Sequence, residues 1–180
     1  YTQLDAMLLR NYGDYMRVDA LGLKAGSYQL KIVPVDNSGN EVASEAAETG
    51  ALAVAAHDRN GFAHFNYSKG VGAYNNDGTL KAGAKVFYVT KQTAKTISSD
   101  VAGVGTCTGL QAIIDGYQKG QDKTPIAFRI IGTIQTADMD ALSSSSEGLQ
   151  IKGKAADSEL NITIEGVGND ATIKGFGFLV

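Results

Sequence analysis

The chain has 180 residues, a formal net charge of −3, 43% hydrophobic residues and 19% charged residues. This apolar fraction is sufficient for a buried core and argues against general disorder. The mild acidic balance and the scattered basic residues argue against a nucleic-acid-binding surface, and no stretch approaches the ~20 apolar residues of a membrane span. Glycine is abundant, at 22 residues, and proline is scarce, at two, which predicts an ordered fold with many turns.

Cysteine and the first residue add little about the fold. Cys107 is the single cysteine, so no disulfide framework is expected. Tyr1 is not a natural start, and we therefore expect native sequence before it.

The first sixty residues are predicted to form antiparallel strands. Apolar and polar residues alternate over Asp14–Leu23 and again over Ser27–Val35, as in half-buried strands. The short segment Lys24–Gly26 separates these two runs. Asp36–Asn40 has the composition of a turn, and Ala51–Ala56 is predicted to be the last strand of this part.

The segment Leu23–Tyr28 resembles a corner found in fibronectin type III domains. In those domains a tyrosine hydroxyl bonds back to the upstream backbone and fixes the turn. A complete domain of that kind has about seven strands, whereas only three or four can be identified here. The resemblance implies that residues 1–68 are the C-terminal part of such a domain plus a connector, with apolar residues of its inner face left exposed.

One helix is predicted in the chain. Over Thr108–Tyr117, apolar residues recur at helical spacing, and Thr106 or Thr108 is a plausible N-cap. A compact strand, Lys85–Thr90, precedes it.

Four short strands rich in β-branched residues are predicted after the helix, with no helix between them: Pro125–Ile134, Gly148–Lys152, Leu160–Glu165 and Ala171–Val180. Parallel strands usually need a helical crossover, and antiparallel neighbours favour two-residue hairpins. Neither pattern is evident. A solenoid, in which short strands stack side by side from coil to coil, accounts for the spacing. In such a fold Leu110, Ile113 and Ile114 of the helix would cover the open end of the core.

The order of segments along the second part resembles the opening of bacterial pectate lyases, the first family of polysaccharide lyases. The segments that carry the resemblance are Gly72–Thr79, Gln118–Gly120, Pro125–Ile134, Ser144–Gly153, Asn161–Gly168 and Ala171–Phe178. The resemblance implies an all-β chain: a partial fibronectin type III-like sandwich, then the N-terminal coils of a right-handed parallel β-helix with one capping helix. The expected domains are residues 1–68 and residues 69–180.

The same resemblance implies a function for the parent protein. Pectate lyases cleave polygalacturonate by β-elimination: calcium neutralises the uronate carboxylate, and an arginine removes the C5 proton. In the family these residues lie in later coils, so we expect them beyond residue 180. No catalytic, cofactor-binding or metal residue is therefore assigned in this chain, which we expect to be inactive alone. The parent protein is expected to be bacterial, and secreted, periplasmic or at the cell surface. The alternative is a non-catalytic β-helix protein that binds or displays carbohydrate.

Several residues could suggest a site, but each has a simpler interpretation. Asp138 and Asp140 could offer carboxylates to calcium, but calcium takes six to eight oxygens, and a solvated turn is favoured. Arg129 could be a catalytic base, but alternation places it opposite Phe128, which favours an exterior structural charge.

The remaining polar motifs have equally weak signatures. His57 and His64 lack cysteine partners and make a poor metal-ligand set, so interface histidines are favoured. Ser143–Ser146 has no nucleophile motif and is interpreted as a loop. Gly166–Gly168 and Gly175–Gly177 are interpreted as solenoid corners rather than phosphate loops.

Overall fold

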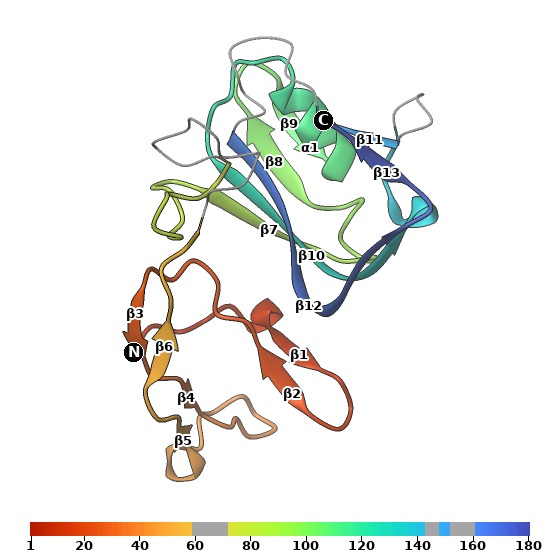
Figure 1. The fold of residues 1–180 in the computed structure, drawn as a ribbon. Helices are drawn as coiled ribbons and strands as arrows, with labels where there is room; N and C mark the ends of the chain where they lie inside the picture. Colours follow the sequence, from red (N-terminus) through yellow and green to blue (C-terminus); the bar gives the residue numbers. More distant parts are fainter. Residues whose placement is uncertain (59–71, 143–147, 152–160) are drawn as a thin grey trace.

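The computed structural model describes residues 1–58, 72–142, 148–151 and 161–180 (Figure 1). This part of the chain consists mainly of strands with one α-helix, which confirms the predicted all-β class. None of its helices is long and apolar enough to cross a membrane.

The N-terminal part is built from short antiparallel strands. In chain order its elements are η1 (Ala6–Leu8), β1 (Leu9–Asn11), β2 (Met16–Val18), β3 (Gly26–Tyr28), β4 (Lys31–Ile32), η2 (Ala43–Glu45), β5 (Ala47–Glu48) and β6 (Leu52–Val54). Strands β1 and β2 form one hairpin. Strand β3 pairs with β6, and β4 pairs with β5, so these four strands form one long interrupted hairpin. The Asp36 carboxylate closes its turn, as predicted, by accepting hydrogen bonds from the N–H groups of Ser38 and Asn40 at 2.8 and 2.9 Å.

The strands of this part are shorter than the alternation predicted. The expected strands over residues 14–23 and 27–35 contain only β2, β3 and β4. The register of the long hairpin shifts between the pairs Tyr28–Leu52 and Ile32–Ala47, which breaks the ladder of hydrogen bonds. Alternation reports which face a residue takes, but a strand continues only where a partner strand stays in register. Ile32 and Leu52 are 60% and 42% exposed, in line with the expected exposure of apolar residues here.

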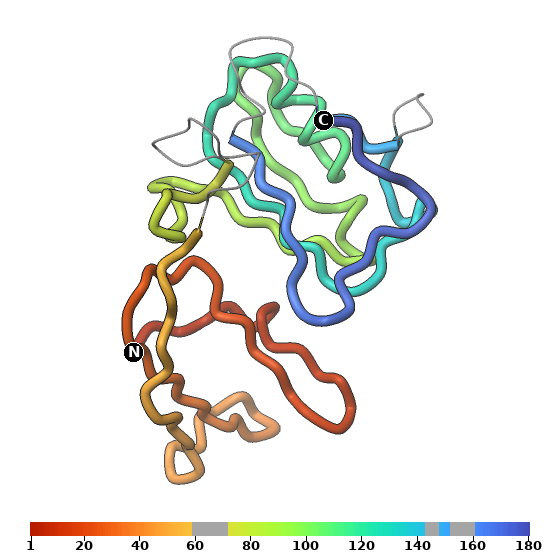
Figure 2. Tube along the Cα trace, in the orientation of Figure 1, coloured from red at the N-terminus to blue at the C-terminus, as the bar shows by residue number. Residues whose placement is uncertain are grey.

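The second part is organised around a parallel sheet. In chain order its elements are β7 (Lys85–Val89), β8 (Ser98–Val101), β9 (Gly105–Thr108), α1 (Leu110–Tyr117), β10 (Ile126–Gln135), η4 (Thr136–Asp138), β11 (Gly148–Gln150), β12 (Ile162–Lys174) and β13 (Gly177–Leu179). Strand β10 lies between β7 and β12 and is parallel to both. Strand β11 is parallel to β13 in a separate small sheet. The succession β12–β13 thus repeats β10–β11 alongside it, which confirms that segments from Pro125 onward pair in parallel (Figures 1 and 2).

Strand β12 corrects the expectation of two separate strands over residues 160–165 and 171–180. It runs continuously through Gly166 and Val167, which were interpreted as part of a corner. Val167 lies opposite Ile131, and Thr172 lies opposite Thr133, so four residues of β12 face one residue of β10. We call these four residues the 168–171 bulge. The second glycine segment, Gly175–Gly177, does lie at the bend between β12 and β13, as predicted.

The helix α1 confirms the predicted helical segment, but its N-cap differs from the prediction. Thr106 and Thr108 both belong to β9, which pairs with β8 in an antiparallel hairpin that the sequence analysis did not identify. Gly109 occupies the N-cap position and has no side chain to offer.

A distant carboxylate supplies the missing cap. Both oxygens of Asp140 accept hydrogen bonds from the first turn of α1, from the N–H of Gln111 at 3.1 Å and of Ala112 at 3.0 Å. A negative charge here also complements the helix dipole. A Cβ atom at Gly109 would lie 2.3 Å from Cγ of Asp140, and its φ of +100° is itself unfavourable for other residues. Glycine at this position therefore allows the carboxylate to reach the helix.

The inner face of the parallel sheet forms the main core. Ile126, Phe128 and Ile130 of β10 point to this face. The Phe87 and Phe128 rings stack on neighbouring strands with centroids 5.9 Å apart. The helix α1 packs on this core through four buried side chains, namely Leu110, Ile113, Ile114 and Tyr117. The predicted apolar stripe of the helix therefore covers the core.

Gln111 of α1 and Gln118, the C-cap residue of this helix, cover the edge of β11. The Gln111 side-chain amide donates to the Gln150 carbonyl at 3.5 Å and accepts from the Gln150 N–H at 3.3 Å. Gln118 donates to the same carbonyl at 2.9 Å. Asp115 accepts from both glutamine amides, at 2.7 and 3.2 Å, and so orients them. These amides occupy the position that a further strand would take beside β11.

The outer face of the parallel sheet is covered by segments that precede it in the chain. Leu8 of η1 is 3% exposed and packs with Ile131 and Val167. Ala73 and Tyr74 pack on Ala127 of β10. Both faces of the sheet are thus buried, the outer one by residues from far upstream.

Candidate functional site

A charged network on the outer face is the strongest candidate site among the described residues. Tyr88, Arg129 and Glu165 occupy directly opposed positions on β7, β10 and β12. Because side chains alternate along a strand, all three point to the face opposite Phe128. Tyr74 reaches the same place from the segment that precedes β7.

Each nitrogen of the Arg129 guanidinium donates a hydrogen bond to one of these neighbours. Its Nε donates to Glu165 Oε1 at 2.9 Å, Nη1 donates to the Tyr88 hydroxyl at 3.0 Å, and Nη2 donates to the Tyr74 hydroxyl at 3.1 Å. The Arg129 side chain is 5% exposed and that of Glu165 is 23% exposed. The prediction of an exterior charge is therefore right about the face and wrong about exposure, because upstream residues cover that face.

Burial and hydrogen bonding shift the pKa values of two members of the network, Arg129 and Tyr74. Burial alone would lower the pKa of Arg129, but hydrogen bonds with Tyr74, Glu165 and Tyr88 outweigh it and raise that pKa. Burial also raises the pKa of Tyr74 to about 12, with Arg129 opposing and Glu165 supporting the shift. Tyr74 therefore keeps its proton, and its hydroxyl donates a hydrogen bond to Glu165 Oε1 at 2.5 Å. The three hydrogen bonds of Arg129 join β7, β10 and β12 to the segment that precedes β7.

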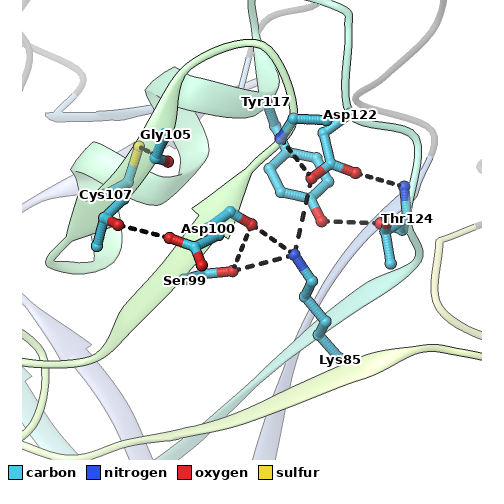
Figure 3. A network of polar contacts seen from close by, with 10 residues as sticks. Lys85, Ser99, Asp100, Gly105, Cys107, Tyr117, Asp122 and Thr124 are labelled. Atoms are coloured by element: carbon cyan, nitrogen blue, oxygen red, sulfur yellow. Dashed lines mark hydrogen bonds and ion pairs between the residues drawn. The ribbon is translucent and has the colours of Figure 1, made fainter.

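A second polar cluster ties the start of β7 to the β8–β9 hairpin (Figure 3). Lys85 Nζ donates to Ser99 Oγ at 3.2 Å and to the Asp100 carbonyl at 2.7 Å. The same ammonium lies 3.7 Å from Oδ2 of Asp122, whose side chain is 4% exposed.

Asp122 is the centre of this second cluster. It accepts hydrogen bonds from the N–H groups of Ala102 at 3.0 Å and Thr124 at 2.8 Å. Burial opposes its charge, but these bonds and Lys85 prevail, so the pKa of Asp122 lies below its ordinary value. The Tyr117 hydroxyl donates to the Thr124 carbonyl at 2.9 Å (Figure 3). These interactions join β7, the β8–β9 hairpin, the end of α1 and the segment that leads into β10.

Among the described residues, the sequence-predicted candidates Asp138, Asp140 and His57 have separate local contacts. Asp138 accepts from the Gln135 N–H at 2.8 Å within a local turn, while Asp140 caps α1. The carboxylates of this pair are therefore directed at backbone groups. His57 is exposed beside Gly78. His64 and Ser143–Ser146 lie outside the described residues.

The network residues around Arg129 were missed because their contact depends on register. Alternation alone indicated the face of Arg129, but no sequence signal identified Glu165 as the residue opposite it on β12. The one available hint was an arginine inside an otherwise apolar strand, a position that demands partners.

Comparisons with known proteins give no relative for this chain: no protein-family model, curated protein or solved structure matches it. The described residues define an all-β chain that contains a parallel sheet.

Proposed function

We propose that this chain forms the first coils of a right-handed parallel β-helix in a pectate lyase that acts on polygalacturonate. The observation that carries the proposal is the repeated pairing in which β12 stacks on β10 and β13 stacks on β11. The chain contributes a strand to each of two sheets in turn, and its next two strands pair in parallel with these. Such a repeat is what a solenoid coil requires. Four of the segments that resemble the lyase family contribute strands to this repeat: Pro125–Ile134, Ser144–Gly153, Asn161–Gly168 and Ala171–Phe178.

The N-terminal part supports the second element of the proposal, a partial fibronectin type III-like sandwich. The Tyr28 hydroxyl donates to the Lys24 carbonyl at 2.9 Å, which is the bond that the corner resemblance implies. The long hairpin closed at Asp36 leaves Ile32 and Leu52 exposed, as a sandwich without its other strands would.

Calcium is proposed for the parent enzyme and is not assigned to residues here. No group of three or more acidic, histidine or cysteine side chains suited to a metal occurs within residues 1–58, 72–142, 148–151 and 161–180. Both oxygens of Asp140 already serve α1. The chain's proposed role is that of a scaffold in a secreted, periplasmic or cell-surface bacterial protein.

The test is β-elimination of polygalacturonate, followed by the absorbance of the unsaturated product. We expect the purified 180-residue chain to give no product with calcium. A longer natural polypeptide that contains this sequence should give product, and a chelator should abolish it. Turnover by the 180-residue chain would contradict the scaffold role.

The alternative is a β-helix protein that binds carbohydrate without cleaving it. It predicts that the longer polypeptide is retarded in a gel containing polygalacturonate but releases no unsaturated product at any calcium concentration. That outcome would replace the lyase proposal while leaving the solenoid geometry intact.

A further inference from the structure

The polar contacts between the β1–β2 hairpin and the parallel sheet gather at the 168–171 bulge. Figure 2 shows the bend of β12, in blue, beside the N-terminal hairpin in red. Arg10 Nη2 lies 2.8 Å from Asp170 Oδ2, and the Tyr12 hydroxyl donates to Asp170 Oδ1 at 2.9 Å. The Tyr12 oxygen in turn accepts a hydrogen bond from the Asn169 N–H at 2.7 Å.

The side chain of Asn169 extends the contact along the hairpin. Its amide nitrogen donates to the Tyr15 hydroxyl at 3.3 Å, and its oxygen accepts from Arg17. The Tyr12 and Tyr15 rings stack with centroids 5.2 Å apart, which fixes both hydroxyls toward the bulge. Asp19 holds Arg17 through a bidentate pair.

The backbone of the bulge is shaped to admit the hairpin. Gly168 has a φ of +85°, and a Cβ atom there would lie 2.3 Å from the Tyr12 hydroxyl oxygen. Beneath these polar contacts lies the apolar patch of Leu8, Ile131 and Val167, each no more than 3% exposed. The interface thus combines three features: a three-residue insertion relative to β10, a close-packed glycine and a buried apolar patch.

We propose that the 168–171 bulge is an intramolecular docking site for the β1–β2 hairpin, and that it makes the N-terminal part and the parallel sheet move and unfold as one unit. The partner is the chain's own N-terminus. Polar contacts set the orientation, and burial of Leu8 supplies the apolar component. This inference is independent of any lyase activity.

The test uses the whole chain with two spin labels, attached at the exposed positions Ser38→Cys and Lys91→Cys on a Cys107→Ala background, and measures the distribution of distances between them. The labelled chain without further substitution should give one narrow distribution of distances and a single unfolding transition. Gly168→Ala inserts a methyl group against the Tyr12 hydroxyl, and we expect it to broaden the distribution and to separate an early unfolding step of the N-terminal part.

Gly83→Ala is the matched control. Gly83 also has a positive φ, +74°, but no atom lies within 4 Å of the added Cβ, so this variant has the backbone strain without the collision. It should keep the narrow distribution. A broad distribution in the labelled chain without a glycine substitution, or equal broadening in both glycine variants, would overturn the proposal.

Tyr12→Phe is the second variant, and it decides the question if Gly168→Ala does not fold. It keeps the ring stack and removes only the hydroxyl that joins Asp170 and Asn169. We expect a broader distribution of distances than in the labelled chain that keeps Tyr12. An unchanged distribution and an unchanged single transition would count against the docking site.

Discussion

The buried pair Arg129–Glu165 yields an asymmetric prediction for stability. Removing one partner of a buried pair typically costs roughly 3–5 kcal/mol, because the other charge stays buried without compensation. Glu165→Met leaves the cation of Arg129 with its side chain 5% exposed, and we expect a cost of about 3 kcal/mol. Arg129→Met leaves a carboxylate that is 23% exposed and reachable by water, so its cost should be about 1–2 kcal/mol.

The double variant Arg129→Met/Glu165→Met separates pairing from packing. Replacing both charges by apolar groups is often close to neutral, so the double variant should be more stable than Glu165→Met alone. The measurement is urea unfolding of all four proteins, with the coupling free energy taken from the double-mutant cycle. For a chain of this size, about 3 kcal/mol corresponds to a fall in Tm of about 6–12 °C. Equal costs for the two single variants, or additive costs in the double, would refute the reasoning.

Three further predictions concern the helix cap, acid stability and the core. Asp140→Ala should lower the free energy of unfolding by about 1 kcal/mol through loss of the α1 cap, whereas Asp138→Ala should cost less; equal thermal shifts would contradict the capping role. The low pKa of Asp122 adds stability at pH values above the ordinary carboxyl pKa of 3.8, and this contribution is lost as the pH falls through the lower folded-state pKa. The difference in free energy of unfolding between the unsubstituted chain and Asp122→Asn should therefore shrink on acidification. A difference that is constant with pH would rule out a stabilising role for the Asp122 charge. Phe128→Ala should cost about 3–5 kcal/mol in chemical unfolding because it leaves a cavity beneath Phe87, and a cost below about 1 kcal/mol would show that the ring is not core.

Local patterns in the sequence predicted the helix and the parallel pairing of the second part but not the β8–β9 hairpin. Helical spacing identified α1, and the absence of hairpin turns after Pro125 indicated parallel pairing. Both signals depend on periodicity and turn chemistry, which act between near neighbours. Where a glycine segment resembled a turn, at Gly166–Gly168, β12 continued instead, because pairing with β10 holds the chain extended through a bulge.

Contacts between distant segments could not be predicted. The carboxylate that caps α1 lies 29 positions from the amide it serves, and Glu165 lies 36 positions from Arg129. Alternation gave the outward direction of Arg129 but contained no information on what would cover it. The Tyr74 and Leu8 contacts that bury this face depend on how upstream segments fold back, which only the three-dimensional register defines.

Gln111 and the C-cap residue Gln118 cover one edge of the small β11–β13 sheet. Exposed strand edges are templates on which other chains can add and begin aggregation. At β11 that template is already occupied, because the amides of Gln111 and Gln118 satisfy both backbone groups of Gln150. Recruitment of a foreign strand on this side would first have to displace two side chains that Asp115 holds in place, so the molecule resists fibrous stacking from this direction.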